Sequence, residues 1–428
     1  MPDRRWPDVR YGVMDTELAS TIQPRTPVAG IDRNEFTNSA RCFSVENVAP
    51  VVGMSPAFIR RVVGSKKTLT VDDVLLLLDQ DAYGETFVPR SKILGYLHSR
   101  TPEEMRGGAD FRVPSPFDLV NTDALDFARQ LPNGTVNCIV TSTPYWAMRV
   151  YKESTAVSWA DGECVPYGHE QTPEAFVRHT IEMLHELKRV LTTDGSIWWN
   201  VMDTFNTRTQ IRGNAAEALR AMQGAEQGKA WTDHAYRRYS AGHSFLKDGE
   251  QIGIPSMIAQ RASRIGLFLK STITWAKTAT LPEPQKSRVS RQLEYVLHFS
   301  NQRAPKFHKE AYSQLGTELG GRNELLETAK LSDVWVIPTS SGGDGHGAQF
   351  PAALPGRCIA LSTDPGDVVF DPFVGSGTSV IAALALGRRA IGVDTSKEYL
   401  ATASRKIAAF LGTVPGEDKL RKPEISAI

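Results

Sequence analysis

One segment near the C-terminus limits the folds open to this chain more than any other. Residues 364–379 read DPGDVVFDPFVGSGTS, an apolar stretch that runs into an acidic residue and then a turn containing Gly375 and Gly377. These glycines allow a sharp bend and a close approach of the backbone to a ligand. The next apolar run ends at Asp394, where an acidic side chain commonly accepts hydrogen bonds from ribose hydroxyls. The pattern predicts a strand, a glycine-rich turn and a helix that bind a nucleoside-bearing ligand.

The turn lacks the third glycine of a dinucleotide fingerprint and the lysine of a phosphate loop, which disfavours dinucleotides and ATP. Strands and helices alternate before it: residues 136–141 are apolar, 174–191 have helical spacing and 196–201 are apolar again. Strand, helix and strand in that order indicate a doubly wound, mostly parallel α/β sheet. The polar, glycine-rich and basic stretch 206–253 interrupts the pattern and is predicted to be an insertion.

A second motif stands at the end of the first apolar run. Residues 141–146 read TSTPYW, at the carboxyl edge of the predicted sheet, where folds of this kind bind ligands. The Ser142 hydroxyl and the Thr143 carbonyl are hydrogen-bond acceptors, and Tyr145 offers an aromatic face. These residues resemble the catalytic tetrapeptide of the DNA amino-methyltransferases, and the resemblance implies the following chemistry. An exocyclic base amine is a poor nucleophile because its lone pair is delocalised into the ring. Acceptors that draw its N–H bonds favour a pyramidal, reactive nitrogen.

Both motifs resemble those of the S-adenosylmethionine-dependent DNA amino-methyltransferases. Residues 371–378, DPFVGSGT, resemble the cofactor motif, and 346–351, HGAQFP, are similar to the motif that precedes it. Residues 142–145 resemble the catalytic tetrapeptide, in which Asp, Asn or Ser is followed by Pro-Pro and by Tyr or Phe. The catalytic segment comes first, as in the circularly permuted β group. Over roughly 120–407 the resemblance implies a seven-stranded, Rossmann-like methyltransferase sheet.

The resemblance also implies roles for particular residues. S-adenosylmethionine is the implied cofactor, no metal is required, and the substrate is a base flipped out of double-stranded DNA. The implied catalytic residues are Ser142, Thr143, Pro144 and Tyr145. The implied cofactor-binding residues are Asp123, Phe350, Pro351, Asp371, Phe373, Gly375, Gly377, Thr378, Ser379 and Asp394. A solvated turn carboxylate is a competing interpretation of Asp123.

Two positions leave alternatives open. Ser142 favours cytosine-N4 as the methylated atom, because adenine-N6 enzymes more often carry Asp or Asn there; adenine-N6 methylation is the alternative. Thr143 stands where the family has its first proline, which is expected to loosen the turn. That substitution leaves room for a non-catalytic, cofactor-binding DNA regulator. The order of the motifs disfavours methylation of protein glutamine or RNA, since those families place the cofactor motif first.

Residues 1–115 are predicted to form a helical N-terminal region, and 116–428 the methyltransferase domain. Ser55 fits a helix N-cap, Pro56 the first helical position and Gly64 the helix end. With the preceding helix this gives a helix-turn-helix pattern, for which DNA binding and plain packing are equally good interpretations. The candidate phosphate-contacting residues are Arg60, Arg61, Arg237, Arg238, Lys286, Arg288 and Arg291. The last three open a basic segment, about 286–330, that continues with Arg303, Lys306 and Lys309.

Composition adds few limits. The 428 residues carry a formal charge of +1, which neither favours nor excludes DNA. No stretch approaches the roughly 18 apolar residues of a membrane span, and the charged start lacks the apolar core of a secretory signal. We therefore expect a cytoplasmic, nucleoid-associated protein. The four cysteines are too scattered to predict a zinc site or a disulfide. A cognate restriction endonuclease and homodimer formation are left open as partners.

Overall fold

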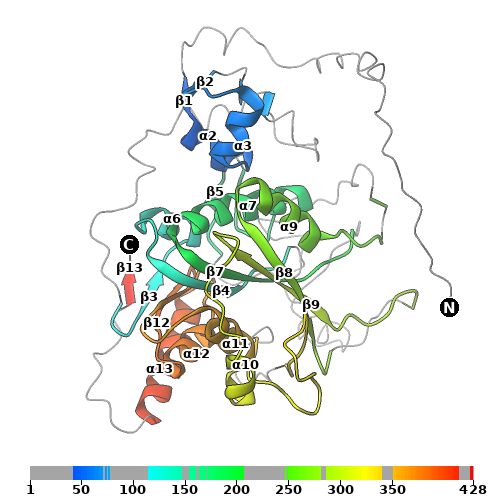
Figure 1. Ribbon diagram of the computed structural model, residues 1–428, viewed down its shortest axis with the longest axis vertical. Helices are drawn as coiled ribbons and strands as arrows, with labels where there is room; N and C mark the ends of the chain where they lie inside the picture. Colours follow the sequence, from blue (N-terminus) through cyan, green and yellow to red (C-terminus); the bar gives the residue numbers. More distant parts are fainter. Residues whose placement is uncertain are drawn as a thin grey trace, which may run out of the picture. The chain divides into compact units, whose positions relative to one another are not determined.

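A computed structural model gives the structure of the chain. It describes residues 42–70, 73–74, 76–77, 114–146, 154–160, 163–170, 172–206, 246–247, 249–280, 286–339, 350–413 and 425–427. Residues 41–428 form one compact unit. At its centre lies a nine-stranded sheet in the order β10-β8-β9-β7-β4-β11-β12-β3-β13 (Figure 1). The strands are β3 Phe117–Asn121, β4 Val136–Ser142, β7 Leu191–Val201, β8 Phe268–Ala276, β9 Leu293–Ser300, β10 Val334–Val336, β11 Val368–Asp371, β12 Arg389–Asp394 and β13 Ile425–Ala427.

The predicted fold class is confirmed. Every strand is parallel to its neighbours except β9, which runs antiparallel to both β7 and β8. Seven strands were expected; the short strands β10 and β13 extend the sheet by one at each side. Because β9 is reversed, its amino end lies with the carboxyl ends of the other strands. We call this side of the sheet the carboxyl edge.

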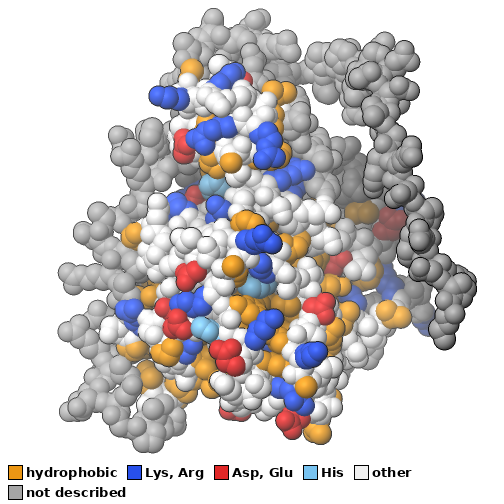
Figure 2. Space-filling model, in the orientation of Figure 1, with side chains coloured by type: hydrophobic (Ala, Val, Ile, Leu, Met, Phe, Trp, Pro, Cys, Tyr) orange, Lys and Arg blue, Asp and Glu red, His pale blue; other side chains and the backbone are white. Residues whose placement is uncertain are grey.

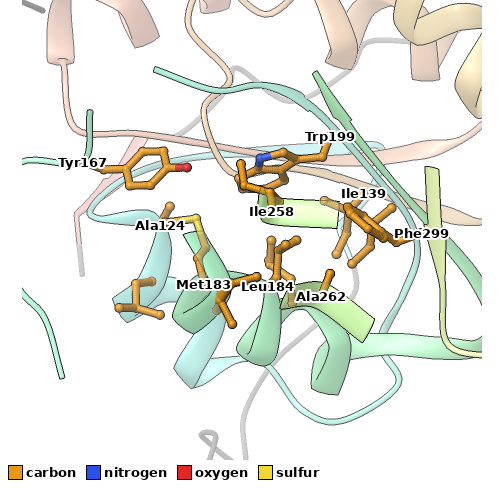
Figure 3. Packing of buried hydrophobic residues seen from close by; sticks show 14 of the residues in the cluster. Ala124, Ile139, Tyr167, Met183, Leu184, Trp199, Ile258, Ala262 and Phe299 are labelled. Atoms are coloured by element: carbon orange, nitrogen blue, oxygen red, sulfur yellow. The ribbon is translucent and has the colours of Figure 1, made fainter. Parts of the chain in front are cut away.

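Helices cover both faces of the sheet. On one face lie α6 Ala124–Gln130, α7 Pro173–Val190 and α9 Ile254–Arg264, and on the other α11 Ala353–Ser362, α12 Thr378–Ala385 and α13 Lys397–Thr413. The alternation of β4 shows why the layers form: Ile139 joins the core under α7, whereas Cys138 and Val140 join the core under α11. Figure 3 shows the first core, with Met183 and Leu184 of α7 packed beneath Trp199 of β7.

A helical hairpin precedes the sheet in sequence, as predicted. Helices α2 Val45–Val52 and α3 Pro56–Val63 are joined by a turn, and the strands β1 Phe43–Ser44 and β2 Thr68–Leu69 pair antiparallel beside them. The Ser55 side chain accepts a hydrogen bond from the Phe58 N–H at 3.2 Å, which confirms the predicted cap. The Ser55 N–H donates to the Arg264 carbonyl at the end of α9, so the hairpin is attached to the main unit.

The boundary predicted at residue 115 stays a prediction, since residues 78–113 lie outside the described part of the chain. Among the described residues, no helix combines the length and apolar character needed to cross a bilayer. The two ends of the predicted insertion lie side by side. The Asn206 side chain donates to the Leu246 carbonyl at 2.8 Å, and Phe205 forms a β-bridge with Gln251. Residues 207–245 lie outside the described residues.

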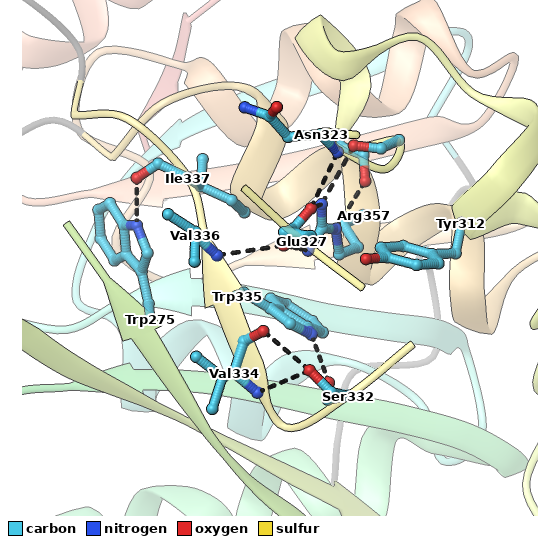
Figure 4. Close-up of polar contacts among 12 residues, drawn as sticks. Trp275, Tyr312, Asn323, Glu327, Ser332, Val334, Trp335, Val336, Ile337 and Arg357 are labelled. Atoms are coloured by element: carbon cyan, nitrogen blue, oxygen red, sulfur yellow. Dashed lines mark hydrogen bonds and ion pairs between the residues drawn. The ribbon is translucent and has the colours of Figure 1, made fainter. Parts of the chain in front are cut away.

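A buried ion pair fixes the chain between β9 and β10. Arg357 of α11 donates to both carboxylate oxygens of Glu327, at 2.7 and 2.8 Å, and its Nε donates to the Gly320 carbonyl (Figure 4). The rings of Tyr312 and Trp335 lie 5.0 Å from the guanidinium. This part of the predicted basic segment, which includes α10 Ala311–Gln314 and the 3-10 helix η3 Thr317–Leu319, is therefore tied to the sheet.

Candidate active site

The turn after β4 is anchored to the neighbouring strand. Ser142 ends β4 directly opposite Asn200 of β7. The N–H and the hydroxyl of Thr143 both donate to the Asn200 carbonyl at 3.2 Å. Proline has no N–H and could make neither bond. Thr143 was expected to loosen the turn, but its two hydrogen bonds hold it against β7.

The rest of the turn packs against a segment that follows the short strands β5 Val157–Ser158 and β6 Cys164–Val165. Gly168 has a φ of 90°, and a Cβ there would lie 3.1 Å from the Cβ of Pro144. The Trp146 indole N–H donates to the Glu170 carbonyl at 3.0 Å, and Trp146 is buried. The turn is thus held from two sides while Tyr145 stays half-buried.

The Tyr145 hydroxyl lies in a network of polar side chains. It donates to Oε2 of Glu294, accepts from the Asn200 amide at 2.8 Å and lies 3.2 Å from the Ser142 hydroxyl. The Asn200 amide also donates to Glu294 at 2.8 Å. The Lys277 ammonium, just past β8, reaches the other Glu294 oxygen at 2.7 Å. These side chains come from four different strand ends at the carboxyl edge.

Sequence analysis did not assign Asn200, Glu294 or Lys277 to the site. Asn200 and Glu294 are buried, at 3% and 7% exposure, and Oδ1 of Asn200 has no hydrogen-bond partner among the described residues. A buried amide oxygen normally has a partner, which points to a ligand group there. One sequence pattern could have identified Asn200 as a site residue: it is a polar residue at the end of the apolar run 196–199. Glu294 could not be found this way because it begins its strand.

The carboxylate of Asp371 holds the glycine-rich turn together. It accepts hydrogen bonds from the Thr141 hydroxyl at 2.6 Å, the Ser379 hydroxyl at 2.5 Å and the Phe373 N–H at 3.0 Å. Burial raises the pKa of Asp371 to about 6, despite these hydrogen bonds, and the nearby charge of Asp394 adds to the rise. Asp371 therefore joins β4, β11 and α12, and its oxygens are largely occupied by the protein itself.

The turn itself has the backbone shape that the sequence predicted. Gly375 and Gly377 have φ angles of 50° and 85°, in the left-handed region that favours glycine. A Cβ on Gly377 would lie 3.0 Å from Ala403 of α13, whereas Gly375 has nothing nearer than 4.0 Å. Asp394, at the end of β12, accepts from the N–H groups of Gly375 and Ser396, at 3.0 and 2.8 Å. The turn leaves open space at Gly375 beside a carboxylate.

A cavity of about 440 Å³ lies at the ends of β3 and β12, and Thr395, the residue after Asp394, forms part of its lining. Its lining is Asn121, Thr122, Asp123, Asp126, Thr155, Ala156, Val157, Ser158 and Thr395. The Asn121 amide ties the two strand ends by donating to the carbonyls of Asp394 and Thr395. A mostly polar cavity at the ends of these two strands fits a nucleoside.

Asp123 has a structural role that sequence analysis did not foresee. It is the N-cap of α6 and accepts from the N–H groups of Leu125 and Asp126, at 2.8 and 3.1 Å. Burial raises its pKa. Asp123 is therefore a capping carboxylate that also faces the cavity, rather than a solvated turn residue.

The remaining predicted cofactor residues lie around the same edge. Phe373 is half-buried, its ring stacked 5.3 Å from that of Tyr167 and edge-on to Trp199. Thr378 begins α12. Phe350 and Pro351 lead into α11, and Phe350 packs against the core beneath that helix. The structure thus brings every predicted cofactor residue to the carboxyl edge.

Comparisons with known proteins show which family the chain belongs to. Residues 136–405 match a family described as DNA methylase, with N6 and N4 methyltransferases as its members. The chain belongs to this family. The methyltransferase is 30% identical to the Type II methyltransferase M.Cfr9I of Citrobacter freundii over 316 residues, 73% of this chain and 91% of that protein. It is 30% identical to the Type II methyltransferase M.XycI of Xanthomonas campestris pv. cyanopsidis over 68% of this chain and 87% of that protein. The family acts on DNA and uses S-adenosylmethionine.

Among solved structures, the methyltransferase is similar to the PvuII DNA methyltransferase, whose described specificity is cytosine-N4. The TM-score is 0.47 and the identity 18%, covering 72% of this chain and 89% of that one.

The predicted DNA contacts of the methyltransferase divide between the two edges of the sheet. Arg288 and Arg291 precede β9 and lie at the carboxyl edge, where their guanidinium groups stand 3.9 and 5.1 Å from the ring centre of Phe205. Lys286 is exposed beside them. Lys306 follows β9 at the opposite edge and forms ion pairs with Asp364 and Asp367. The basic segment is therefore not one surface.

The other predicted contacts lie on the hairpin or outside the described residues. Arg60 forms an exposed ion pair with Glu46 at 3.0 Å, and Arg61 is exposed. In Figure 2, the Lys and Arg side chains over α2 and α3 have few acidic neighbours, whereas the lower half of that view mixes both charges. Arg237 and Arg238 lie within 207–245, outside the described residues.

Proposed function

We propose that the methyltransferase transfers a methyl group from S-adenosylmethionine to the exocyclic N4 amine of a cytosine flipped out of double-stranded DNA. The observation that carries this proposal is the position of the Ser142 hydroxyl. It stands at the end of β4, next to the strand that carries the glycine-rich turn, and Asn200 and Tyr145 hold it in place. Serine at this position resembles the cytosine-N4 branch of the family.

The cofactor would lie along the ends of β11, β12 and β3. The glycine backbone at 375–377 gives room for close contact, and Asp394 would accept hydrogen bonds from the ribose hydroxyls. The adenine ring would occupy the cavity beside Asp123. Phe350 and Pro351, with Phe373 and the start of α12, would enclose the methionine part. When bound, the cofactor supplies an electrophilic methyl group on a sulfonium.

The residues after β4 would prepare the amine for attack. The Ser142 hydroxyl and the Thr143 carbonyl accept its N–H bonds and favour a pyramidal nitrogen, whose lone pair then points at the methyl group. Because Thr143 is anchored to Asn200, its carbonyl is held in one place before the base arrives. The charge of the network matters too, since Glu294 is paired with Lys277 and leaves the pocket without excess charge.

The base must leave the duplex to reach this turn, which costs a few kcal/mol. Stacking on the half-buried Tyr145 ring would return roughly 1 to 3 kcal/mol of that cost. The exposed Lys286 and the half-buried Arg288 and Arg291, all at the carboxyl edge, would contact the DNA phosphates there. Arg60 and Arg61 of α3 would extend the contact if the hairpin binds DNA.

Mass spectrometry of the product tests the proposal directly. The purified protein is incubated with S-adenosylmethionine and unmethylated duplex DNA of mixed sequence, and the nucleosides are then separated. We expect N4-methylcytosine; N6-methyladenine as the sole product would show that adenine is the target. No methylated nucleoside at all would favour the non-catalytic regulator, an idea that the secure anchoring of Thr143 weakens.

The names of the relatives suggest the cellular role. M.Cfr9I and M.XycI are named Type II methyltransferases, which favours a restriction-modification function with a cognate endonuclease that cuts the unmethylated site. In such a role the methyltransferase would work at the nucleoid. The gene can be introduced into a host that lacks it. Digestion of that host's DNA with restriction endonucleases would then reveal which sequences are protected.

A further inference from the structure

The methylated amine must release a proton, and the geometry points to a route for it. We propose that the proton passes from the amine through the hydroxyls of Ser142 and Tyr145 to the carboxylate of Glu294. This rests on the proposed amine methylation but not on the choice of cytosine. It gives Tyr145 a second task besides stacking, and it gives a role to the buried carboxylate of Glu294, which lies outside the catalytic tetrapeptide and the cofactor motif.

The hydrogen-bond donors and acceptors set the direction of this route. An ionised carboxylate only accepts, so the Tyr145 hydroxyl must donate to Glu294. The Tyr145 oxygen then has lone pairs for the Asn200 amide, at 2.8 Å, and for the Ser142 hydroxyl, at 3.2 Å. With its own hydrogen turned toward Tyr145 and one lone pair accepting from the Asn200 amide at 3.3 Å, the Ser142 oxygen keeps its second lone pair for an N–H of the amine. In each hydrogen bond of this route, the donor therefore lies nearer to the amine than the acceptor does.

Neighbouring groups keep Glu294 in the accepting state. Lys277, from the end of β8, lies 2.7 Å from Oε1. The Asn200 amide, from β7, donates to Oε2 at 2.8 Å, as does the Tyr145 hydroxyl from the turn after β4. These are the charged and polar groups seen to contact its carboxylate in the described part of the chain. All of them are hydrogen-bond donors to the carboxylate, which fits its role as the acceptor at the end of the route.

The atoms and electrons balance. The nitrogen lone pair forms the new N–C bond, and the electrons of the C–S bond stay with sulfur, which becomes a neutral thioether. The nitrogen then carries a positive charge and an extra hydrogen. It gives that proton to the Ser142 oxygen as the Ser142 proton moves to Tyr145 and the Tyr145 proton to Glu294. Both hydroxyls end as they began, and Glu294 later returns its proton to water.

Matched variants separate this role from stacking and from simple structure. Tyr145→Phe keeps the ring and removes the hydroxyl, and Glu294→Gln keeps the shape and removes the accepting charge. Tyr295→Phe is the control, since Tyr295 is the next residue of β9 and its side chain points to the other face of the sheet. Single-turnover methylation of mixed-sequence duplex DNA is measured for each single variant and for the double variant, and cofactor binding is measured by calorimetry.

We expect each of the two site variants to slow methyl transfer by roughly tenfold to a thousandfold, within the range of general acid–base catalysis. The double variant should be no slower than the worse single one, because both act on one route. Cofactor binding and Tyr295→Phe should match the native protein.

Two results would overturn the route: native rates in Glu294→Gln, or additive losses in the double variant. The identity of the methylated nucleoside is read from the same reactions. A product of N6-methyladenine would reject the cytosine assignment while leaving the proton route open to the same rate tests. Failure of the route with N4-methylcytosine as product would reject the route alone.

Discussion

The carboxyl edge of the sheet has two halves that use their polar side chains differently. In the cofactor half, Asp371 and Asp394 bind backbone N–H groups and adjacent hydroxyls, and so give the glycine-rich turn its shape. In the catalytic half, Tyr145, Asn200 and Glu294 bind one another. A substitution in the first half should therefore change stability and cofactor affinity, whereas one in the second should change the rate of the chemistry.

Removal of the aromatic ring in the catalytic half should have the largest effect. We expect Tyr145→Ala to lower the single-turnover rate by roughly 10² to 10⁴, since it removes both the stacking surface and the hydroxyl. Cofactor affinity, measured by calorimetry, should stay as in the native protein. A parallel loss of cofactor affinity would show that the two halves are not independent.

In the cofactor half, the pH dependence of Asp371 gives the next largest effect. Burial raises its pKa from an ordinary 3.8 to about 6, so the folded state binds a proton more readily than the unfolded chain. This group's contribution is therefore most favourable in acid and is lost as the pH rises from about 4 to 6, by about 3 kcal/mol.

Asp371→Asn should remove that pH dependence and also weaken cofactor binding, because an amide cannot accept from both hydroxyls, those of Thr141 and Ser379. Denaturant unfolding of both proteins across this pH range measures the difference. Equal pH slopes in the two proteins would mean that Asp371 is not the titrating group. If Asp371→Asn methylates DNA at the native rate when the cofactor is saturating, the substitution affects cofactor binding and not the chemical step.

Asp123 tests whether a helix cap also serves the ligand. Asp123→Ala should lower the free energy of unfolding by about 1 kcal/mol through loss of the α6 cap. Asp123→Asn is the matched control, because asparagine caps equally well but carries no charge. A native-like cofactor affinity in Asp123→Asn would show that the carboxylate does not contact the adenine, and a weakened one would show that it does.

The smallest expected effect separates the two edges of the basic segment. Lys286→Gln, at the carboxyl edge, should lower the slope of log affinity for DNA against log salt by about 1. Lys309→Gln, which removes an exposed charge at the opposite edge, should leave the slope unchanged. Fluorescence anisotropy with a labelled duplex at several salt concentrations gives both slopes, and equal slopes for the two variants would contradict the division.

Local patterns predicted much of this structure. The strands at 136–142 and 368–371, the cap at Ser55 and the left-handed glycines at 375 and 377 all follow from rules that act over a few residues. The alternation of strands and helices also predicted the sheet, since each amphipathic element must bury one face.

Other features depend on contacts between distant residues, and sequence patterns did not reveal them. Glu294 reaches Tyr145 only because β9 runs antiparallel to its neighbours, and an apolar run indicates a strand but not its direction. Arg291 and Lys306 lie at opposite edges because β9 runs between them, and the reversal of β9 places Arg291 at the carboxyl edge. The helix-capping role of Asp123 was not predicted, because the resemblance had assigned this residue to cofactor binding.

Thr143 shows how a family motif can change without losing its geometry. The codons of threonine and proline differ by one base, so a single mutation converts one form of the turn into the other. A proline ring restrains the backbone covalently, whereas Thr143 restrains it through two bonds to the Asn200 carbonyl. Genome searches that require the second letter of the tetrapeptide to be proline would therefore overlook working enzymes of this kind.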